Sequence, residues 1–200
     1  MSRRGRLIVA TRNAHKLEEL GEILGDWELV PLPDEVVLPP EDGETFAENA
    51  LGKARAARDA TGLDAIADDS GIAAAALGGR PGVRSARFAG EDASDEQNLA
   101  LLLESVGPDD DRAVAYVCAM AFAGTDGAEL VEEGRCEGTL ASEPRGSGGF
   151  GYDPAFVPSD LGPGDERTMA EIDPAQKHAI SHRGRAARAL AETLAERGAI

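Results

Sequence analysis

The chain has 200 residues, of which 42% are hydrophobic, enough to build one sizeable core or two smaller ones. Its formal charge of -17 at pH 7 argues against binding to nucleic acid or to an anionic membrane, because both depend on clustered Lys and Arg. No apolar run approaches the roughly 20 residues that span a bilayer, and the start MSRRGRLIVAT lacks the apolar region of a signal peptide, so we expect a soluble, cytoplasmic protein.

The first strand and helix are expected at residues 6–11 (RLIVAT) and 13–25 (NAHKLEELGEILG). Asn13 is a candidate N-cap for this helix. The junction TRNAHK is therefore expected to place free backbone N–H groups beside Lys16, at the positive end of a helix.

A second strand is expected at residues 27–32 (WELVPL), followed by a Pro-rich acidic loop at 33–44. Thr45 and Glu48 have the spacing of a capping box, so a second helix is expected to start there and to run to about Gly62.

The rest of the chain continues to mix strand, loop and helix patterns. The expected elements are a strand leading into DDSG (68–71), a glycine-rich loop (77–90), a helix from Ser94 to about Val106, a hairpin (113–124 and 128–138), a second glycine-rich loop (145–158), a helical turn starting at Asp173 and Pro174, and a last helix capped by Ser181. No repeat or linker is apparent, so we expect an α/β fold in one domain of residues 1–200.

Cys118 and Cys136 lie on either side of a predicted turn at Asp126 and Gly127. They would approach each other in one hairpin register and lie on opposite faces in the next, so no disulfide is predicted and buried thiols are expected.

The stretch AIADDSG (65–71) is open to two interpretations. Asp, Ser and Gly are turn formers, so they can simply close a strand as it leaves the core. Alternatively, Asp68 and Asp69 stand at the end of a rigid strand and aim carboxylates at a divalent cation. Other acids could join such a site, namely Glu41, Asp42 and Glu44. Because no Cys or His residues have zinc spacing, Mg²⁺ is expected, with Mn²⁺ as a possible substitute.

Phosphate groups would find donors at the junction TRNAHK, which offers Thr11, Asn13 and Lys16. The alternative is that Asn13 is an ordinary cap and Lys16 a solvated side chain, since the chain has neither a Walker A nor a G-x-G-x-x-G pattern. A base or sugar could stack on Phe150 and Tyr152, beside Asp153 as an acceptor, although aromatic residues can equally fill a core.

Six motifs together resemble one family, the inosine triphosphate pyrophosphatase-like enzymes that clear non-standard nucleotides. In chain order they are ATRNAHK, TFAENALGKA, IADDSG, LGGRPGVRSARFAG, GGFGYDPAF and ISHRG. The resemblance covers nearly the whole chain. It implies cleavage of purine nucleoside triphosphates such as dITP, ITP and XTP between the α and β phosphorus atoms, releasing the monophosphate and pyrophosphate. It also implies an elongated two-lobed mixed-sheet fold with a nucleotide cleft between the lobes, and a homodimer.

The resemblance also implies roles for individual residues. The triphosphate would be held by Thr11, Arg12, Asn13, Ala14, His15, Lys16 and Lys53, with Ser70 as a further substrate contact. The nucleoside would be bound by Phe150, Gly151, Tyr152, Asp153, Lys177, His182 and Arg183. Glu41 and Asp69 would bind Mg²⁺, and Asp69 would also be the proton acceptor, with Asp68 in a supporting role.

One position departs from the family pattern, which usually has Gly where this chain has Arg12. Glycine permits close backbone approach, so either the loop sits differently or Arg12 adds a phosphate contact. Two other functions also remain open. A phosphomonoesterase would release orthophosphate, and a non-catalytic nucleotide-binding regulator would bind a nucleotide without turnover.

Overall fold

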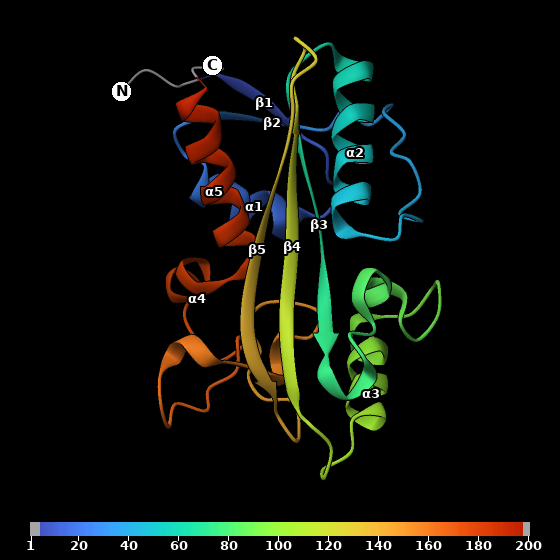
Figure 1. Ribbon diagram of the computed structural model, residues 1–200, viewed down its shortest axis with the longest axis vertical. Coiled ribbons are helices and arrows are strands. Elements are labelled where there is room, and N and C mark those ends of the chain that lie inside the picture. The colour runs from blue at the N-terminus through green and yellow to red at the C-terminus, as the bar shows by residue number, and fades with distance from the viewer. Residues whose placement is uncertain (1–4, 198–200) are drawn as a thin grey trace. The chain divides into compact units, whose positions relative to one another are not determined.

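Six strands form one mixed sheet in the computed structural model, which describes residues 5–197 (Figure 1). The strands are β1 (Arg6–Val9), β2 (Glu28–Pro31), β3 (Ala65–Ala74), β4 (Ala113–Ala123), β5 (Glu129–Leu140) and β6 (Phe156–Pro158). The α-helices are α1 (Ala14–Ile23), α2 (Phe46–Thr61), α3 (Asp95–Ser105), α4 (Pro174–Ile180) and α5 (His182–Glu196). The sheet order is β2-β1-β3-β4-β5-β6, with β1 parallel to β2 and β3, and β5 antiparallel to β6. The predicted α/β fold is confirmed.

The chain divides into two compact units, neither of which is continuous in sequence. Unit 1 contains the described residues of Met1–Asp69, Cys118–Gly134 and His182–Ile200, and unit 2 contains Ser70–Val117 and Arg135–Ser181. Three of the four boundaries fall inside β3, β4 and β5, so each of these strands contributes residues to both units, and the fourth lies between α4 and α5. That residues 1–200 act as one domain stays a prediction.

Unit 1 has helices on both faces of its strands, because the strand residues alternate between two hydrophobic clusters. Leu7 and Val9 pack with residues of α1 and α5, whereas Ile8 packs with residues of α2. The same alternation separates Ile66 from Ala67 in β3. Figure 1 shows α2 and α5 on opposite sides of the strands of this unit.

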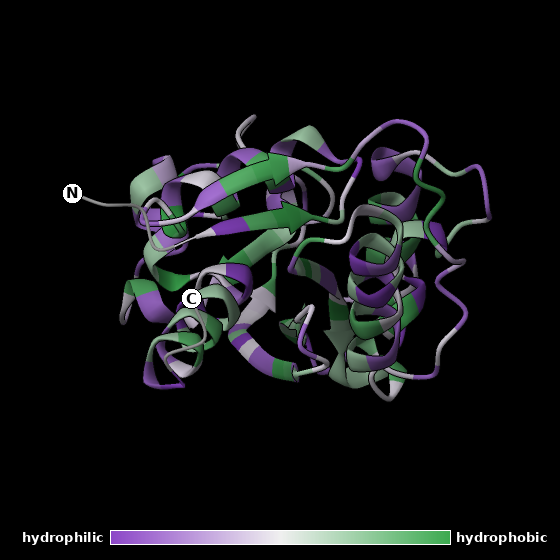
Figure 2. Cartoon of the chain, turned by 90° about the horizontal axis from the view of Figure 1, so that it is seen from above, coloured by the Kyte–Doolittle hydropathy of each residue, from purple (hydrophilic) through white to green (hydrophobic). Residues whose placement is uncertain are grey.

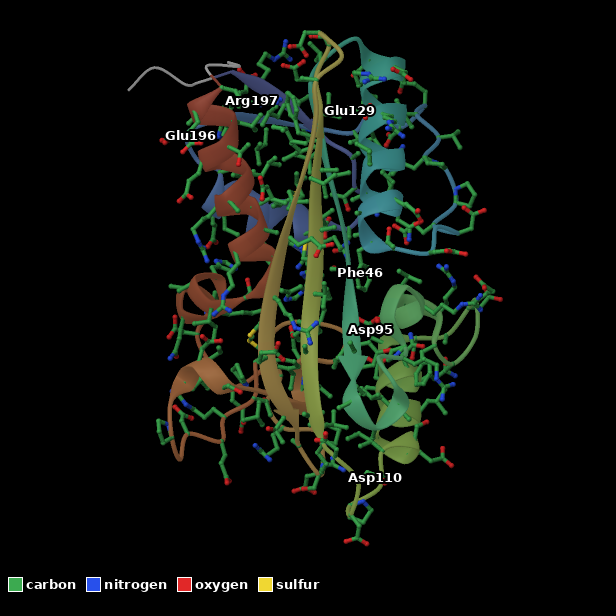
Figure 3. The ribbon with its side chains drawn as sticks, in the orientation of Figure 1. Phe46, Asp95, Asp110, Glu129, Glu196 and Arg197 are labelled. Carbon is green, nitrogen blue, oxygen red and sulfur yellow. The ribbon has the colours of Figure 1, made fainter. Side chains whose placement is uncertain are left out.

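The helices of unit 1 begin where the sequence predicts. Asn13 caps α1, and Thr45 caps α2 through a complete capping box with Glu48. Phe46, which begins α2, is labelled in Figure 3. The helix ends at Thr61 and is followed by the C-cap Gly62, whose φ of 67° lies in the left-handed region that glycine tolerates.

Unit 2 has its own core, which joins β3 and β4 to α3 and to the loops around β6. Its largest fully buried side chains include Phe156, Leu102 and Met169. Ser94 caps α3 through a second capping box, as expected for a helix that starts there. Figure 2 shows helical ribbons banded with hydrophilic and hydrophobic residues, as expected of helices that bury one face. No helix among residues 5–197 combines the length and hydropathy needed to cross a membrane.

The prediction that a strand closes at DDSG is wrong, because β3 continues through these residues to Ala74. Close packing requires a glycine at position 71, and Gly71 does not form a turn. A Cβ at Gly71 would lie 2.3 Å from Ser85 Oγ and 2.5 Å from the Gly82 carbonyl oxygen. Ser85 Oγ in turn accepts a hydrogen bond of 2.8 Å from the Ile72 amide. A tertiary contact has therefore overridden the turn propensity of the sequence.

The predicted hairpin joins β4 and β5, and its turn is closed by a hydrogen bond of 3.0 Å from the Gly127 amide to the Gly124 carbonyl. Cys118 and Cys136 lie on these two strands, are both buried, and form no disulfide. The prediction of buried thiols is confirmed.

Candidate functional site

Asp69 is the centre of a polar cluster on the α2 side of β3. Its Oδ2 accepts a hydrogen bond of 2.8 Å from Asn49 Nδ2, and its Oδ1 lies 3.8 Å from Lys53 Nζ. The same Lys53 ammonium contacts Glu41 Oε1. Asn49 and Lys53 lie one turn apart on α2, and both residues are buried. Glu41 and Asp69, the two predicted cation ligands, therefore share one ammonium group.

The protonation of Asp69 is set by opposing effects. Burial raises the pKa of Asp69, and the positive charge of Lys53 only partly opposes this increase. The nearby Glu41 carboxylate raises the pKa further, whereas the hydrogen bond from Asn49 lowers it. The net pKa is above the usual value for an aspartate, which makes Asp69 a better proton acceptor than an exposed carboxylate.

Asp68 faces the opposite side of β3 and has different partners. Its Oδ2 lies 3.0 Å from Lys16 Nζ and 3.1 Å from Arg183 Nε. The Arg183 guanidinium also pairs with Glu19 Oε2 at 2.6 Å. Adjacent residues of a strand point to opposite faces, so the two aspartates serve separate clusters.

The Asp68 cluster is a buried ion network. Burial alone would raise the pKa of Asp68, but Lys16 and Arg183 together hold it well below its usual range. Burial also raises the pKa of the neighbouring Cys118 thiol to about 12, so the thiol is neutral at pH 7. Asp68 Oδ1 is buried and has no hydrogen-bond donor among the described residues.

The junction between β1 and α1 differs in one respect from the prediction. Its backbone N–H groups were expected to be free, but those of His15 and Lys16 donate to Asn13 Oδ1 at 2.9 and 3.3 Å. Asn13 is thus confirmed as the cap, and Thr11 Oγ1 accepts from the Asn13 amide at 3.2 Å. Asn13, Ala14 and His15 are exposed, and binding of phosphate by this junction stays a prediction.

In unit 2, Asp153 joins several of the predicted nucleoside-binding residues. Its Oδ2 accepts from Lys177 Nζ at 2.8 Å and from the Phe150 amide at 3.0 Å, and its Oδ1 accepts from the Tyr116 hydroxyl at 3.1 Å. Lys177 Nζ also lies 5.0 Å from the centroid of the Phe150 ring, within the range of a cation–π interaction. Gly149 leaves room for the Asp153 carboxylate, since a Cβ there would lie 2.1 Å from Oδ2.

The neighbouring loop residues are held in place by other contacts of unit 2. The Gly151 amide donates to Asp95 Oδ2 at 2.9 Å, and Asp95 is labelled in Figure 3 at the start of α3. Tyr152 is buried in the core of unit 2, where its hydroxyl donates to the Ser85 carbonyl at 2.7 Å. Ser70 is half-buried on β3. Nucleoside contacts by these residues stay predictions.

The carboxylate oxygens of Glu41 and Asp69 are ligands of the kind that suits a hard divalent cation. Nowhere within the described part of the chain do three His, Cys, Asp or Glu side chains gather as a metal site. Asp42 and Glu44, which the sequence also offers as ligands, are exposed. Glu41 and Asp69 would supply two carboxylates, so phosphate oxygens and water would have to complete the coordination, as they commonly do for Mg²⁺.

Sequence reasoning missed three residues of these clusters. Glu19 resembles any charged helix residue, although it lies three positions after Lys16 and therefore on the same side of α1. Tyr116 lies within a hydrophobic strand, where nothing marks its hydroxyl as a partner of Asp153. Asn49 has no local signal that marks it as a partner of Asp69, because its hydrogen bond to that residue spans 20 positions.

A sequence profile of the Ham1 family matches residues 7–193. The chain belongs to the Ham1 family. The relatives of this Ham1 chain include the dITP/XTP pyrophosphatase of Mycobacterium tuberculosis strain H37Rv, which is 50% identical over 94% of this chain and 95% of that protein.

Solved structures of similar sequence have the same fold. A HAM1 protein from Coxiella burnetii superposes with a TM-score of 0.84 and 42% identity, covering 96% of this chain and 98% of the other. A nucleoside-triphosphatase/dITP/XTP pyrophosphatase from Mycobacterium abscessus superposes with a TM-score of 0.72 and 47% identity, covering 94% and 98%. The family resemblance inferred from six motifs is thereby confirmed.

Proposed function

We propose that this chain hydrolyses the non-standard purine nucleoside triphosphates dITP, ITP and XTP to the nucleoside monophosphate and pyrophosphate, with Mg²⁺ as cofactor. The observation that carries the proposal is the cluster of unit 1 in which Asp69 is held by Asn49 and Lys53 beside Glu41. A carboxylate with a raised pKa beside a second carboxylate and a cation is suited to activating water on a phosphate group. The names of the relatives support the same reaction.

In the proposed reaction, the residues of unit 1 activate water and stabilise the leaving group. Asp69 accepts a proton as the water oxygen bonds to the α phosphorus, and the bond from that phosphorus to the bridging oxygen breaks. Pyrophosphate leaves with the electron pair. Asn49 fixes the orientation of the Asp69 carboxylate, and Lys53 stabilises negative charge. Glu41 and Asp69 would hold a divalent cation, which would neutralise phosphate charge and lower the pKa of a bound water.

The remaining residues would bind the substrate. We assign the triphosphate to Thr11 and the segment 13–16 together with Lys53, and a further substrate contact to Ser70. We assign the nucleoside to the segment 150–153 with Lys177, His182 and Arg183. The ammonium of Lys177 near the Phe150 ring supports this assignment, because an electron-rich aromatic face beside a donor suits a purine that carries an oxo group.

Clearing such nucleotides from the precursor pool would prevent their incorporation into DNA or RNA. We further propose that the chain acts in the cytoplasm as a homodimer on small-molecule nucleotides, without a nucleic-acid or membrane partner. The net charge of -17 supports the last point, because it disfavours polyanionic surfaces.

The test compares products and variants. The enzyme is incubated with dITP or ATP, with and without Mg²⁺, and pyrophosphate and orthophosphate are measured separately. Pyrophosphate from dITP, dependent on Mg²⁺ and far exceeding that from ATP, is expected. Asp69→Asn should lower kcat by about 10²-fold or more, since it removes the proton acceptor.

The matched control is Asp59→Asn, which removes an exposed carboxylate of α2 and should leave kcat unchanged. Orthophosphate as the first product would instead indicate a phosphomonoesterase. Tight binding of dITP without turnover would indicate a regulator.

A further inference from the structure

Arg12 binds the loop that follows β2. Its NH1 donates to the Leu32 carbonyl at 3.1 Å, and its NH2 donates to the carbonyls of Pro33, Asp34 and Val36 at 2.8, 3.1 and 2.9 Å. NH1 also lies 3.3 Å from Asp34 Oδ1. One guanidinium thus organises four carbonyl oxygens within the segment 32–36.

These contacts oppose the idea that Arg12 is a phosphate ligand. The two terminal nitrogens of a guanidinium carry four hydrogens, and in this structure they meet five acceptors. To bind a phosphate, Arg12 would have to give up some of its hydrogen bonds to these carbonyl oxygens. The backbone does not demand glycine at this position either, because among the described residues only glycines have positive φ.

The loop held by Arg12 leads directly to Glu41. Val36 and Leu32 are buried in the core beside α2, and the segment between Val36 and Glu41 contains Pro39 and Pro40. Proline fixes φ, so this short connection is stiff. A displacement at Val36 would therefore be transmitted to Glu41.

The far end of the loop is fixed independently of Arg12. The Gly43 amide donates to Asn49 Oδ1 at 2.8 Å, and the Glu44 amide donates to Glu48 Oε2 at 2.8 Å. Both acceptors belong to α2. The segment that carries Glu41 is thus held by α2 after Glu41 and by Arg12 before it.

We propose that Arg12 is a positioning residue, which ties the 32–36 loop to the β1–α1 junction and thereby sets the position of Glu41 for cation binding. The proposal rests on the function proposed above. It gives this chain a connection between two segments of the site that a glycine at position 12 could not provide, because glycine has no side chain to reach the carbonyls.

The test combines hydrogen exchange with kinetics on the full chain. Amide exchange across 33–42 is measured without metal in the parent, Arg12→Gly, Arg12→Lys and Asp34→Ala. Arg12→Gly should speed exchange in this segment about tenfold or more, since it removes several charge-assisted hydrogen bonds. The Val36 amide, which donates to the Pro33 carbonyl at 3.1 Å, is a direct reporter.

Asp34→Ala is the matched control, because it removes one exposed acceptor and leaves the four carbonyls in place. Its exchange should match that of the parent. The exchange rate of Arg12→Lys should lie between those of the parent and Arg12→Gly, because a single ammonium cannot contact all four carbonyls as the planar guanidinium does.

The kinetic readout separates positioning from phosphate binding. For Arg12→Gly, the Mg²⁺ concentration giving half-maximal rate with dITP should rise about fivefold or more, while KM for dITP at saturating Mg²⁺ stays close to that of the parent. Unchanged exchange in Arg12→Gly, or a rise in KM with normal Mg²⁺ activation, would overturn the proposal. Failure of the proposed function would be visible separately, as absence of pyrophosphate release by the parent, whatever the exchange result.

Discussion

Asp68 and Asp69 are chemically identical neighbours with different surroundings. Asp69 meets one ammonium and one amide and has a raised pKa, whereas Asp68 meets two cations and has a lowered pKa. The difference arises because a strand points successive side chains to opposite faces. We therefore assign Asp69 to chemistry and Asp68 to holding Lys16 and Arg183 in place.

Asp68→Asn should lower the free energy of unfolding by about 3 kcal/mol, because it leaves the buried Arg183 and the half-buried Lys16 with one fewer negative partner. Denaturant unfolding at pH 7 measures this loss. The control is Glu28→Gln, which breaks the exposed pair with Arg6 and should change stability by no more than about 1 kcal/mol. A loss for Asp68→Asn as small as that of the control would contradict the structural role.

At the scale of elements, β3 is the strand that carries and orients both Asp68 and Asp69. It stays extended through Gly71, where Ser85 Oγ and the Gly82 carbonyl oxygen occupy the space that a side chain at position 71 would need. The close approach belongs to unit 2, and it involves residues 11 and 14 positions further along the chain.

Gly71→Ala should destabilise the protein by about 1–3 kcal/mol, since the added methyl group has no room. Thermal and denaturant unfolding would measure this effect. Gly21→Ala provides the comparison, because Gly21 is an exposed residue of α1 with open space around it, and its replacement should stabilise by up to about 1 kcal/mol. Equal effects of the two substitutions would show that packing at Gly71 is unimportant.

The sequence predicts the elements whose signals are local. Asn13, Thr45 and Ser94 mark helix starts because a cap interacts only with the next three residues. The course of β3 could not be predicted in this way, because DDSG has local turn propensity and its extended form depends on Ser85. The pairing of Asp68 with Arg183 could not be predicted from local sequence either, because the two residues are 115 positions apart.

At the scale of the whole molecule, the dominant feature is the net charge of -17. Self-repulsion of this size opposes the compact state and is screened by salt. Raising NaCl from about 20 to about 200 mM should therefore increase the free energy of unfolding. Urea unfolding at pH 7 in the presence of EDTA measures the change. A decrease in stability with NaCl would mean that attractive ion pairs outweigh the net repulsion.

The interleaving of the two units in sequence has a consequence for synthesis on the ribosome. Unit 1 begins with β1, but its core also contains Ala186, Ala187, Leu190 and Leu194 of α5. The residues of unit 2 are translated in between, so its core can form before that of unit 1 is complete. Asp68 is translated before Arg183, its partner in α5, so the ion pair between them cannot form until Arg183 has been added to the chain. Strand β3 is therefore synthesised long before α5, the helix that supplies Arg183 as one of the two cationic partners of Asp68.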